Sequence, residues 1–117
     1  MRDIKFRGVD IKTGKMVFGG GIDSQRDTPI IINHGKRYFV DAKTVGQYTG
    51  LKDKNGVEIY EGDILRCQHE HLWFVGFCER GCFVAHDPED ALDYVLLDDW
   101  SFSVIDNIYQ NPELLGN

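Results

Sequence analysis

Residues 44–66, TVGQYTGLKDKNGVEIYEGDILR, constrain the fold of this chain more than any other stretch, because turn signals alternate there with short apolar segments. Residues 53–56, DKNG, end in an asparagine and a glycine, which both tolerate the positive φ of a tight hairpin turn. The flanking residues 48–51 and 57–60 are therefore predicted to fold back on each other as antiparallel strands.

A second turn is predicted at residues 61–63, EGD, immediately after this hairpin. Gly62 suits a tight turn, and the Asp63 carboxylate can accept hydrogen bonds from backbone N–H groups. We expect Asp63 to cap the turn and residues 64–67 to leave it as a strand. This stretch specifies local structure, and no recognisable active site accompanies it elsewhere in the chain.

The rest of the sequence alternates apolar and polar residues with the period of two that is typical of β-strands. Three further hairpins are predicted, from residues 4–8 with 16–18, 30–32 with 38–40, and 72–77 with 82–85. Residues 94–97 and 102–109 are expected to form two more strands, and residues 19–27 a flexible loop. Only residues 86–92 and 111–115 suggest short helical turns, because a proline lies near the start of each.

These patterns predict one all-β domain over residues 1–117, mainly antiparallel, folded as a small barrel or two packed sheets. The rhythm of residues 62–85 favours an SH3-like subregion. A hydrophobic content of 42% and an aromatic content of 12% support a packed core. The chain has no apolar run long enough for a membrane span and no secretory leader, and its three cysteines are too sparse for a disulfide scaffold. We therefore expect a cytoplasmic protein of a bacterial host cell.

The central run VGQYTGLKDKNGVEIYEGDIL resembles the signature of the YopX family of bacteriophage and prophage proteins. The opening IKFRGVD followed by Met16 and the closing VIDNIYQNPELL resemble the same family. Two departures are visible: residues 8–9 are Gly-Val where the family more often has a small residue and a tryptophan, and residues 19–21 are three glycines. The resemblance implies a β-rich fold and a phage setting. It transfers no catalytic residue, because the family has no agreed activity.

A cysteine and histidine set suggests metal chemistry as an alternative. Cys67, His69 and His71 alternate on a strand, so their side chains would share one face and could offer zinc ligands. The alternative zinc site consists of Cys67, Cys78, Cys82 and His86. The spacing lacks the tight knuckle of structural zinc sites, so the favoured interpretation is two small buried cysteines beside a histidine-bearing surface loop, with no metal, cofactor or enzymatic activity.

Acidic residues gather late in the chain, at Asp87, Glu89, Asp90, Asp93, Asp98 and Asp99. Their oxygens could hold a divalent cation or mimic nucleic-acid phosphates, but the spacing does not match an EF-hand loop. A solvated acidic face is the favoured interpretation.

The hairpin signature also offers a candidate binding surface that mixes aromatic and basic groups. Its members are Gln47, Tyr48, Lys52, Lys54 and Tyr60. Such a mixture suits a protein partner or stacked bases. For Tyr48 and Tyr60, cross-strand pairing in the core is the favoured interpretation, because hairpin aromatics commonly pack this way. The net charge of −6 disfavours nucleic acid, because affinity for a polyanion requires Lys and Arg. The leading hypothesis is a noncovalent binding module for an unknown host or phage protein, the alternative is a nucleic-acid-binding barrel, and exposed strand edges allow a homo-oligomer.

Overall fold

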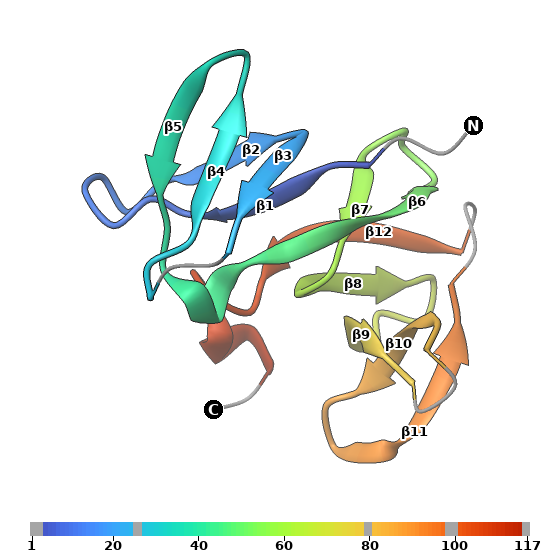
Figure 1. The fold of residues 1–117 in the computed structure, drawn as a ribbon. Coiled ribbons are helices and arrows are strands. Elements are labelled where there is room, and N and C mark those ends of the chain that lie inside the picture. Colours follow the sequence, from blue (N-terminus) through green and yellow to red (C-terminus); the bar gives the residue numbers. More distant parts are fainter. Residues whose placement is uncertain (1–3, 25–26, 79–80, 98–100, 116–117) are drawn as a thin grey trace. The chain divides into compact units, whose positions relative to one another are not determined.

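The computed structural model describes residues 4–24, 27–78, 81–97 and 101–115, and every strand pairing in it is antiparallel. The prediction of an all-β fold is confirmed (Figure 1). The chain divides into two compact units, residues 1–48 and 49–117, which are described separately. None of the helices in the described ranges is both long enough and apolar enough to cross a membrane.

The first unit begins with the predicted hairpin of β1 (Phe6–Val9) and β2 (Met16–Gly19). The turn between these strands is closed by Asp10, whose carboxylate accepts the Lys12 N–H at 2.8 Å. The first residues of β6 (Gly46–Lys52) pair with the other edge of β1. This unit therefore contains β1 as a central strand with hydrogen-bonded neighbours on both sides.

A three-stranded sheet, β3-β4-β5, completes the first unit. It contains β3 (Gly21–Asp23), β4 (Ile30–Asn33) and β5 (Lys36–Phe39), and a 3₁₀ turn at Ala42–Thr44 follows it. The β4–β5 hairpin was predicted, and its turn residues His34 and Gly35 have φ values of 50° and 84°. Both values lie in the region that a tight two-residue hairpin turn requires.

Residues 19–27 do not form one loop, so that expectation was wrong. Gly19 ends β2, and β3 begins at Gly21 and pairs with β4. A Cβ atom at Gly19 would collide with the backbone carbonyl of Ile32. Gly19 therefore permits close backbone packing, although a run of glycines in a sequence suggests flexibility.

The second unit starts with the predicted hairpin between the later part of β6 and β7 (Glu58–Tyr60). Asp53 closes its turn, because its Oδ1 atom accepts the N–H groups of Asn55 at 2.8 Å and Val57 at 2.9 Å. Gly56 has a φ of 84°, as predicted for this turn.

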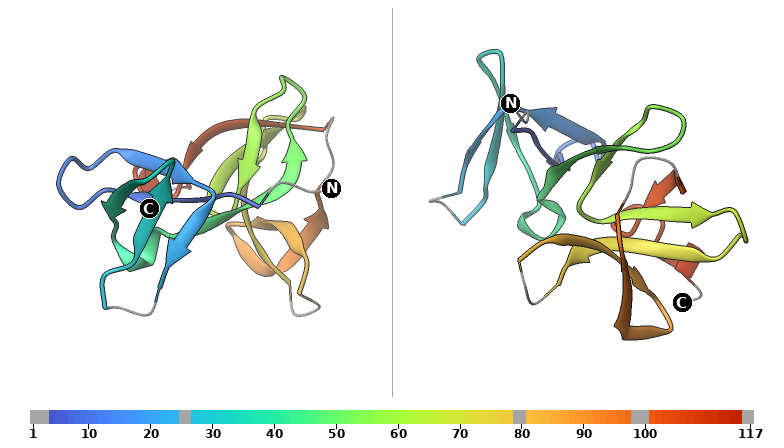
Figure 2. Two further views of the ribbon diagram at one scale, coloured as in Figure 1. Left: turned by 45° about the horizontal axis from the view of Figure 1, so that its top comes forward. Right: turned by 90° about the vertical axis from the view of Figure 1, so that its right-hand side faces the viewer.

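A five-stranded sheet with the order β11-β10-β9-β8-β12 forms most of the second unit. Its strands, yellow-green to red in Figure 2, are β8 (Asp63–Cys67), β9 (Leu72–Phe77), β10 (Phe83–Asp87), β11 (Asp90–Leu96) and β12 (Phe102–Asn107). The last strand returns to pair with the first. An SH3-like barrel requires this order, but the assignment of the barrel itself stays a prediction.

One hydrophobic cluster holds this unit together. Its buried members are Ile59, Leu65, Val75, Ala85 and Phe102. They come from five different strands, so the cluster joins β7 and β12 to the β8–β10 meander. Burial of each large apolar side chain stabilises the fold by roughly 1.5–3 kcal/mol.

The expected helical turn at residues 86–92 was also wrong, because these residues form the β10–β11 hairpin. The Asp87 carboxylate accepts the Glu89 N–H at 2.9 Å, which closes a tight turn between Asp87 and Asp90. Asp87, Pro88 and Glu89, residue types that also favour the start of a helix, therefore form a hairpin turn here. The second predicted turn is confirmed as a 3₁₀ turn at Pro112–Leu115.

Candidate binding site

A cavity with a volume of about 640 Å³ lies within the first unit. It lies where the start of the chain meets the β2–β3 connection and the β4–β5 turn. Its lining residues are Ile4, Lys5, Phe18, Gly19, Gly20, Gly21, Ile32, Asn33 and His34. We call this cavity the glycine groove.

Two adjacent glycines of the groove, Gly19 and Gly20, differ in the space around them. Gly19 is buried against β4 and has no space for a side chain. Gly20 is exposed, and a Cβ atom there would have only the Ile4 carbonyl oxygen within 4 Å, at 3.8 Å. Gly20 also lacks the positive φ that other glycines of the chain adopt. A side chain at Gly20 would therefore extend into the groove without straining the backbone.

The lining of the glycine groove is apolar with a basic edge. Ile4 is 61% exposed and Phe18 is 45% exposed, so two large hydrophobic side chains face solvent beside it. The Lys5 amine lies 5.4 Å from the centre of the Tyr48 ring, and the Tyr48 N–H donates to the Lys5 carbonyl at 2.9 Å. Among the described residues, no aspartate or glutamate lines the groove, although the whole chain carries a net charge of −6.

The predicted binding set on the hairpin is divided between the two units. Tyr48 is 5% exposed and Tyr60 is 3% exposed, so the favoured interpretation that they pack in the core is confirmed, and their place in the exposed binding set was wrong. Both pack in the interior, and they are unavailable as platforms for stacked bases. Gln47 is half-buried, whereas Lys52 and Lys54 are exposed. A binding role for these three residues stays a prediction.

Asp63 has the capping role that its sequence context predicts. Its carboxylate accepts the Tyr60 N–H at 2.7 Å, and the residue is 1% exposed. The preceding Gly62 has a φ of 91° and donates its N–H to the Val75 carbonyl at 2.8 Å. The EGD turn therefore connects β7 and β8 and also binds to β9.

The alternative zinc ligands are not gathered at one point. The Cys67 N–H donates to the His71 carbonyl just before β9, whereas Cys78 follows the end of that strand. A strand of six residues spans about 20 Å, so Cys67 and Cys78 lie far apart. The His86 Nε2 atom lies 3.1 Å from the Phe77 carbonyl oxygen. Within the described ranges, no three His, Cys, Asp or Glu side chains are arranged to hold a metal ion.

The three cysteines differ in exposure, which corrects the expectation of buried cysteines. Cys78 is buried, Cys67 is half-buried and Cys82 is exposed. Burial raises the pKa of the Cys67 thiol, but the neighbouring backbone groups of His69 and His71 favour the thiolate and outweigh this effect. The pKa of Cys67 is therefore lowered from its ordinary value.

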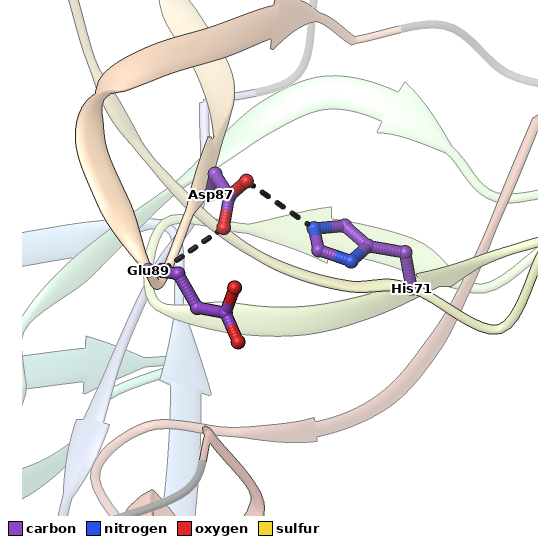
Figure 3. Close-up of polar contacts among 3 residues, drawn as sticks. All are labelled: His71, Asp87 and Glu89. Carbon is purple, nitrogen blue, oxygen red and sulfur yellow. Dashed lines mark hydrogen bonds and ion pairs between the residues drawn. The ribbon is translucent and has the colours of Figure 1, made fainter.

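A carboxylate of the acidic stretch, that of Asp87, lies beside a histidine. The His71 Nε2 atom lies 3.5 Å from the Asp87 carboxylate, and Glu89 donates its backbone N–H to the same side chain (Figure 3). A cavity of about 270 Å³ adjoins this pair and is lined by Glu70, His71, Leu72, Pro88, Glu89, Leu114 and Leu115. Asp98 and Asp99 lie outside the described residues. The polar lining and small size of this cavity make it a weaker candidate than the glycine groove.

The sequence patterns did not identify the glycine groove as a site. Its residues come from three separate stretches, 4–5, 18–21 and 32–34, which β-pairing brings together. The available signal was the run of glycines directly after Phe18. Three adjacent residues without side chains leave a depression wherever the neighbouring strands carry large side chains.

Comparisons with known proteins cover nearly the whole chain. A family model described as YopX protein matches residues 5–116. The crystal structure of protein EF1440 from Enterococcus faecalis is similar, with a TM-score of 0.58 and 25% sequence identity. The similarity covers 98% of this chain and 99% of that one. No curated protein matches the sequence.

Proposed function

The chain belongs to the YopX family, and from this premise we propose that it is a phage- or prophage-derived accessory protein that binds a partner protein noncovalently. Binding takes place in the bacterial host cytoplasm, at the glycine groove, and involves no catalysed reaction. The observation that supports this proposal is the groove itself, an open cavity of about 640 Å³ beside two exposed hydrophobic side chains.

The chemistry of the groove indicates what the partner presents. Phe18 and Ile4 offer exposed apolar surface to a large apolar side chain of the partner. Binding would remove the apolar surfaces of both partners from water. Lys5 adds a positive charge, and none of the described residues that line the groove carries a carboxylate. A segment that carries a large apolar residue next to an aspartate or glutamate is therefore complementary to the groove.

The proposal is tested by selecting ligands from a displayed random peptide library on the purified chain. We expect selected peptides to share an apolar residue beside an acidic one. In fluorescence anisotropy, Gly20→Val should weaken their binding at least tenfold, because the new side chain takes up part of the groove and blocks the ligand there. Phe18→Ala should also weaken binding. Ile11→Ala is the matched control, because Ile11 is 57% exposed but does not line the groove.

Three outcomes would contradict the proposal. Equal affinity of the Gly20→Val chain and the unchanged chain would show that ligands bind elsewhere. A selection that enriches no peptide would remove the support for a peptide-binding groove. A native mass of two chains that Gly20→Val reduces to one would assign the groove to a second copy of this protein. Circular dichroism of each variant would check that it is folded.

A further inference from the structure

Cys78 and Cys82 lie directly opposite each other at the end of the β9–β10 hairpin. The last paired residues of the two strands are Phe77 and Phe83, and the cysteines are the next position outward. The Cys78 N–H donates to the Cys82 carbonyl at 2.9 Å, and the Gly81 N–H donates to the Cys78 carbonyl at 3.0 Å. Gly81 has a φ of 80°, which suits a tight turn. The backbone therefore holds the two cysteines opposite each other.

The two sulfur atoms are 2.8 Å apart, and neither is part of a disulfide bond. A disulfide bond has an S–S distance of about 2.05 Å and joins Cα atoms about 4.4–6.8 Å apart. Directly opposite residues in an antiparallel pair have Cα atoms about 4.5–5.5 Å apart. The hairpin therefore supplies backbone spacing suited to a disulfide, and only a small movement of the side chains is needed.

The two thiols differ in their access to a reagent. Cys82 is exposed, whereas Cys78 is 8% exposed. A dissolved disulfide molecule would therefore reach Cys82 first. The Cys78 thiolate would then be in position to attack the Cys82 sulfur of the resulting mixed disulfide. This division between an accessible thiol and a neighbouring resolving thiol is what two-step thiol–disulfide exchange requires.

We propose that Cys78 and Cys82 form a redox-responsive dithiol site that exchanges with small-molecule disulfides of the glutathione class. The Cys82 thiolate attacks one sulfur of oxidised glutathione, which forms a mixed disulfide and releases one glutathione thiolate. The Cys78 thiolate then attacks the Cys82 sulfur, which forms the Cys78–Cys82 bond and releases the second glutathione thiolate. The two cysteine protons pass to solvent, so the dithiol is oxidised by two electrons and oxidised glutathione is reduced to two thiols.

The consequence is local and independent of the glycine groove, which lies in the other unit. The bond would cross-link the ends of β9 and β10 next to Phe77 and Phe83, whose ring centres are 4.2 Å apart. Phe77 is 46% exposed, so oxidation would act beside an exposed aromatic side chain. Failure of the proposed binding function would leave this inference intact.

The experiment uses the full chain with Cys67→Ser, so that only Cys78 and Cys82 remain. The protein is equilibrated in buffers of defined reduced and oxidised glutathione, quenched with acid and alkylated, and its intact mass is measured. Trypsin cleaves after Arg80, between the two cysteines, so the disulfide would hold peptides 67–80 and 81–117 together. The same titration is repeated in urea to measure the pair in the unfolded chain, and it is repeated on the unchanged chain to check the effect of Cys67→Ser.

We expect an intramolecular disulfide whose equilibrium constant is at least tenfold larger in the native chain than in urea. This ratio corresponds to a reduction potential lower by about 30 mV. Equal constants, or a native chain that accumulates only mixed disulfides or linked dimers, would overturn the proposal. Single variants test the order of attack: with Cys78→Ser, Cys82 should take up glutathione at least tenfold faster than Cys78 does with Cys82→Ser. Equal rates would refute the assigned order.

Discussion

Asp53 and Val104 are 51 residues apart in the sequence and are joined by a hydrogen bond of 2.8 Å from the Val104 N–H to the Asp53 Oδ2 atom. The other carboxylate oxygen of Asp53 accepts the N–H groups of Asn55 and Val57 inside the β6–β7 turn. One buried side chain therefore closes a local turn and also attaches it to β12. This dual role makes Asp53 a sensitive position in the second unit.

We expect Asp53→Ala to lower the free energy of unfolding by about 3 kcal/mol. The substitution leaves three N–H groups without their acceptor, and each buried group that loses its partner costs about 1–3 kcal/mol. Urea unfolding followed by circular dichroism measures the loss. Asp41→Ala is the control, because Asp41 also caps a backbone N–H, that of Lys43, but is exposed. A loss at Asp53 no larger than at Asp41 would contradict the dual role.

Gly62→Ala should destabilise the chain more than Gly56→Ala. Both glycines have positive φ, at 91° and 84°, where an L-residue costs about 1–2 kcal/mol. At Gly62 the new Cβ would also lie 2.5 Å from Cε2 of the Tyr109 ring, whereas nothing lies within 4 Å at Gly56. Thermal unfolding of the two variants compares them. Equal melting temperatures would show that the Tyr109 ring moves aside without cost.

Gly19→Ala and Gly20→Ala should have opposite outcomes although the residues are adjacent. The Cβ at Gly19 would collide with the Ile32 carbonyl, so we expect a loss of about 2 kcal/mol or more through overpacking. At Gly20 we expect no loss, or a gain of up to about 1 kcal/mol, because alanine restricts the unfolded chain. Urea unfolding distinguishes the two. A large loss of stability in Gly20→Ala would contradict the open space around Gly20.

Alkylation of Cys67 should reach its half-maximal rate at a lower pH in the native chain than in urea. The pKa of Cys67 is lowered in the native state, so its reactive thiolate is present at lower pH. A chain with Cys78→Ser and Cys82→Ser reports this thiol alone, with iodoacetamide as the reagent. Coincident pH profiles in the two states would contradict the lowered pKa.

The same lowered pKa has a consequence for stability. Because the native state holds the thiolate more readily, the contribution of Cys67 to stability is fully present above the pKa of the unfolded chain. It is lost as the pH falls through the lower native pKa. Between the native and the unfolded pKa of Cys67, the free energy of unfolding measured in urea should rise with pH. Cys67→Ser should remove this dependence. An unchanged slope in that variant would assign the effect to another group.

The turns were predictable because their chemistry is local. Gly56 has a φ of 84° in the β6–β7 turn, and His34 and Gly35 have φ values of 50° and 84° in the β4–β5 turn. These residue types tolerate such values wherever they occur. Proline and acidic residues misled the prediction at residues 86–92. Asp87 can cap either a helix or a hairpin turn, and pairing between β10 and β11 favours the hairpin.

The sequence by itself determined the antiparallel all-β class and the positions of most hairpins, because alternation and turn residues act over a few neighbours. The tertiary structure decided which face of each strand is buried. The alternating pattern around Tyr48 and Tyr60 does not indicate which face of the strand packs on the core. In the structure both tyrosines are buried. Only the packing of separate strands placed Ile4, Phe18 and Ile32 around one groove. Contacts between distant residues depend on how strands pair and pack, and this information is not local in the sequence.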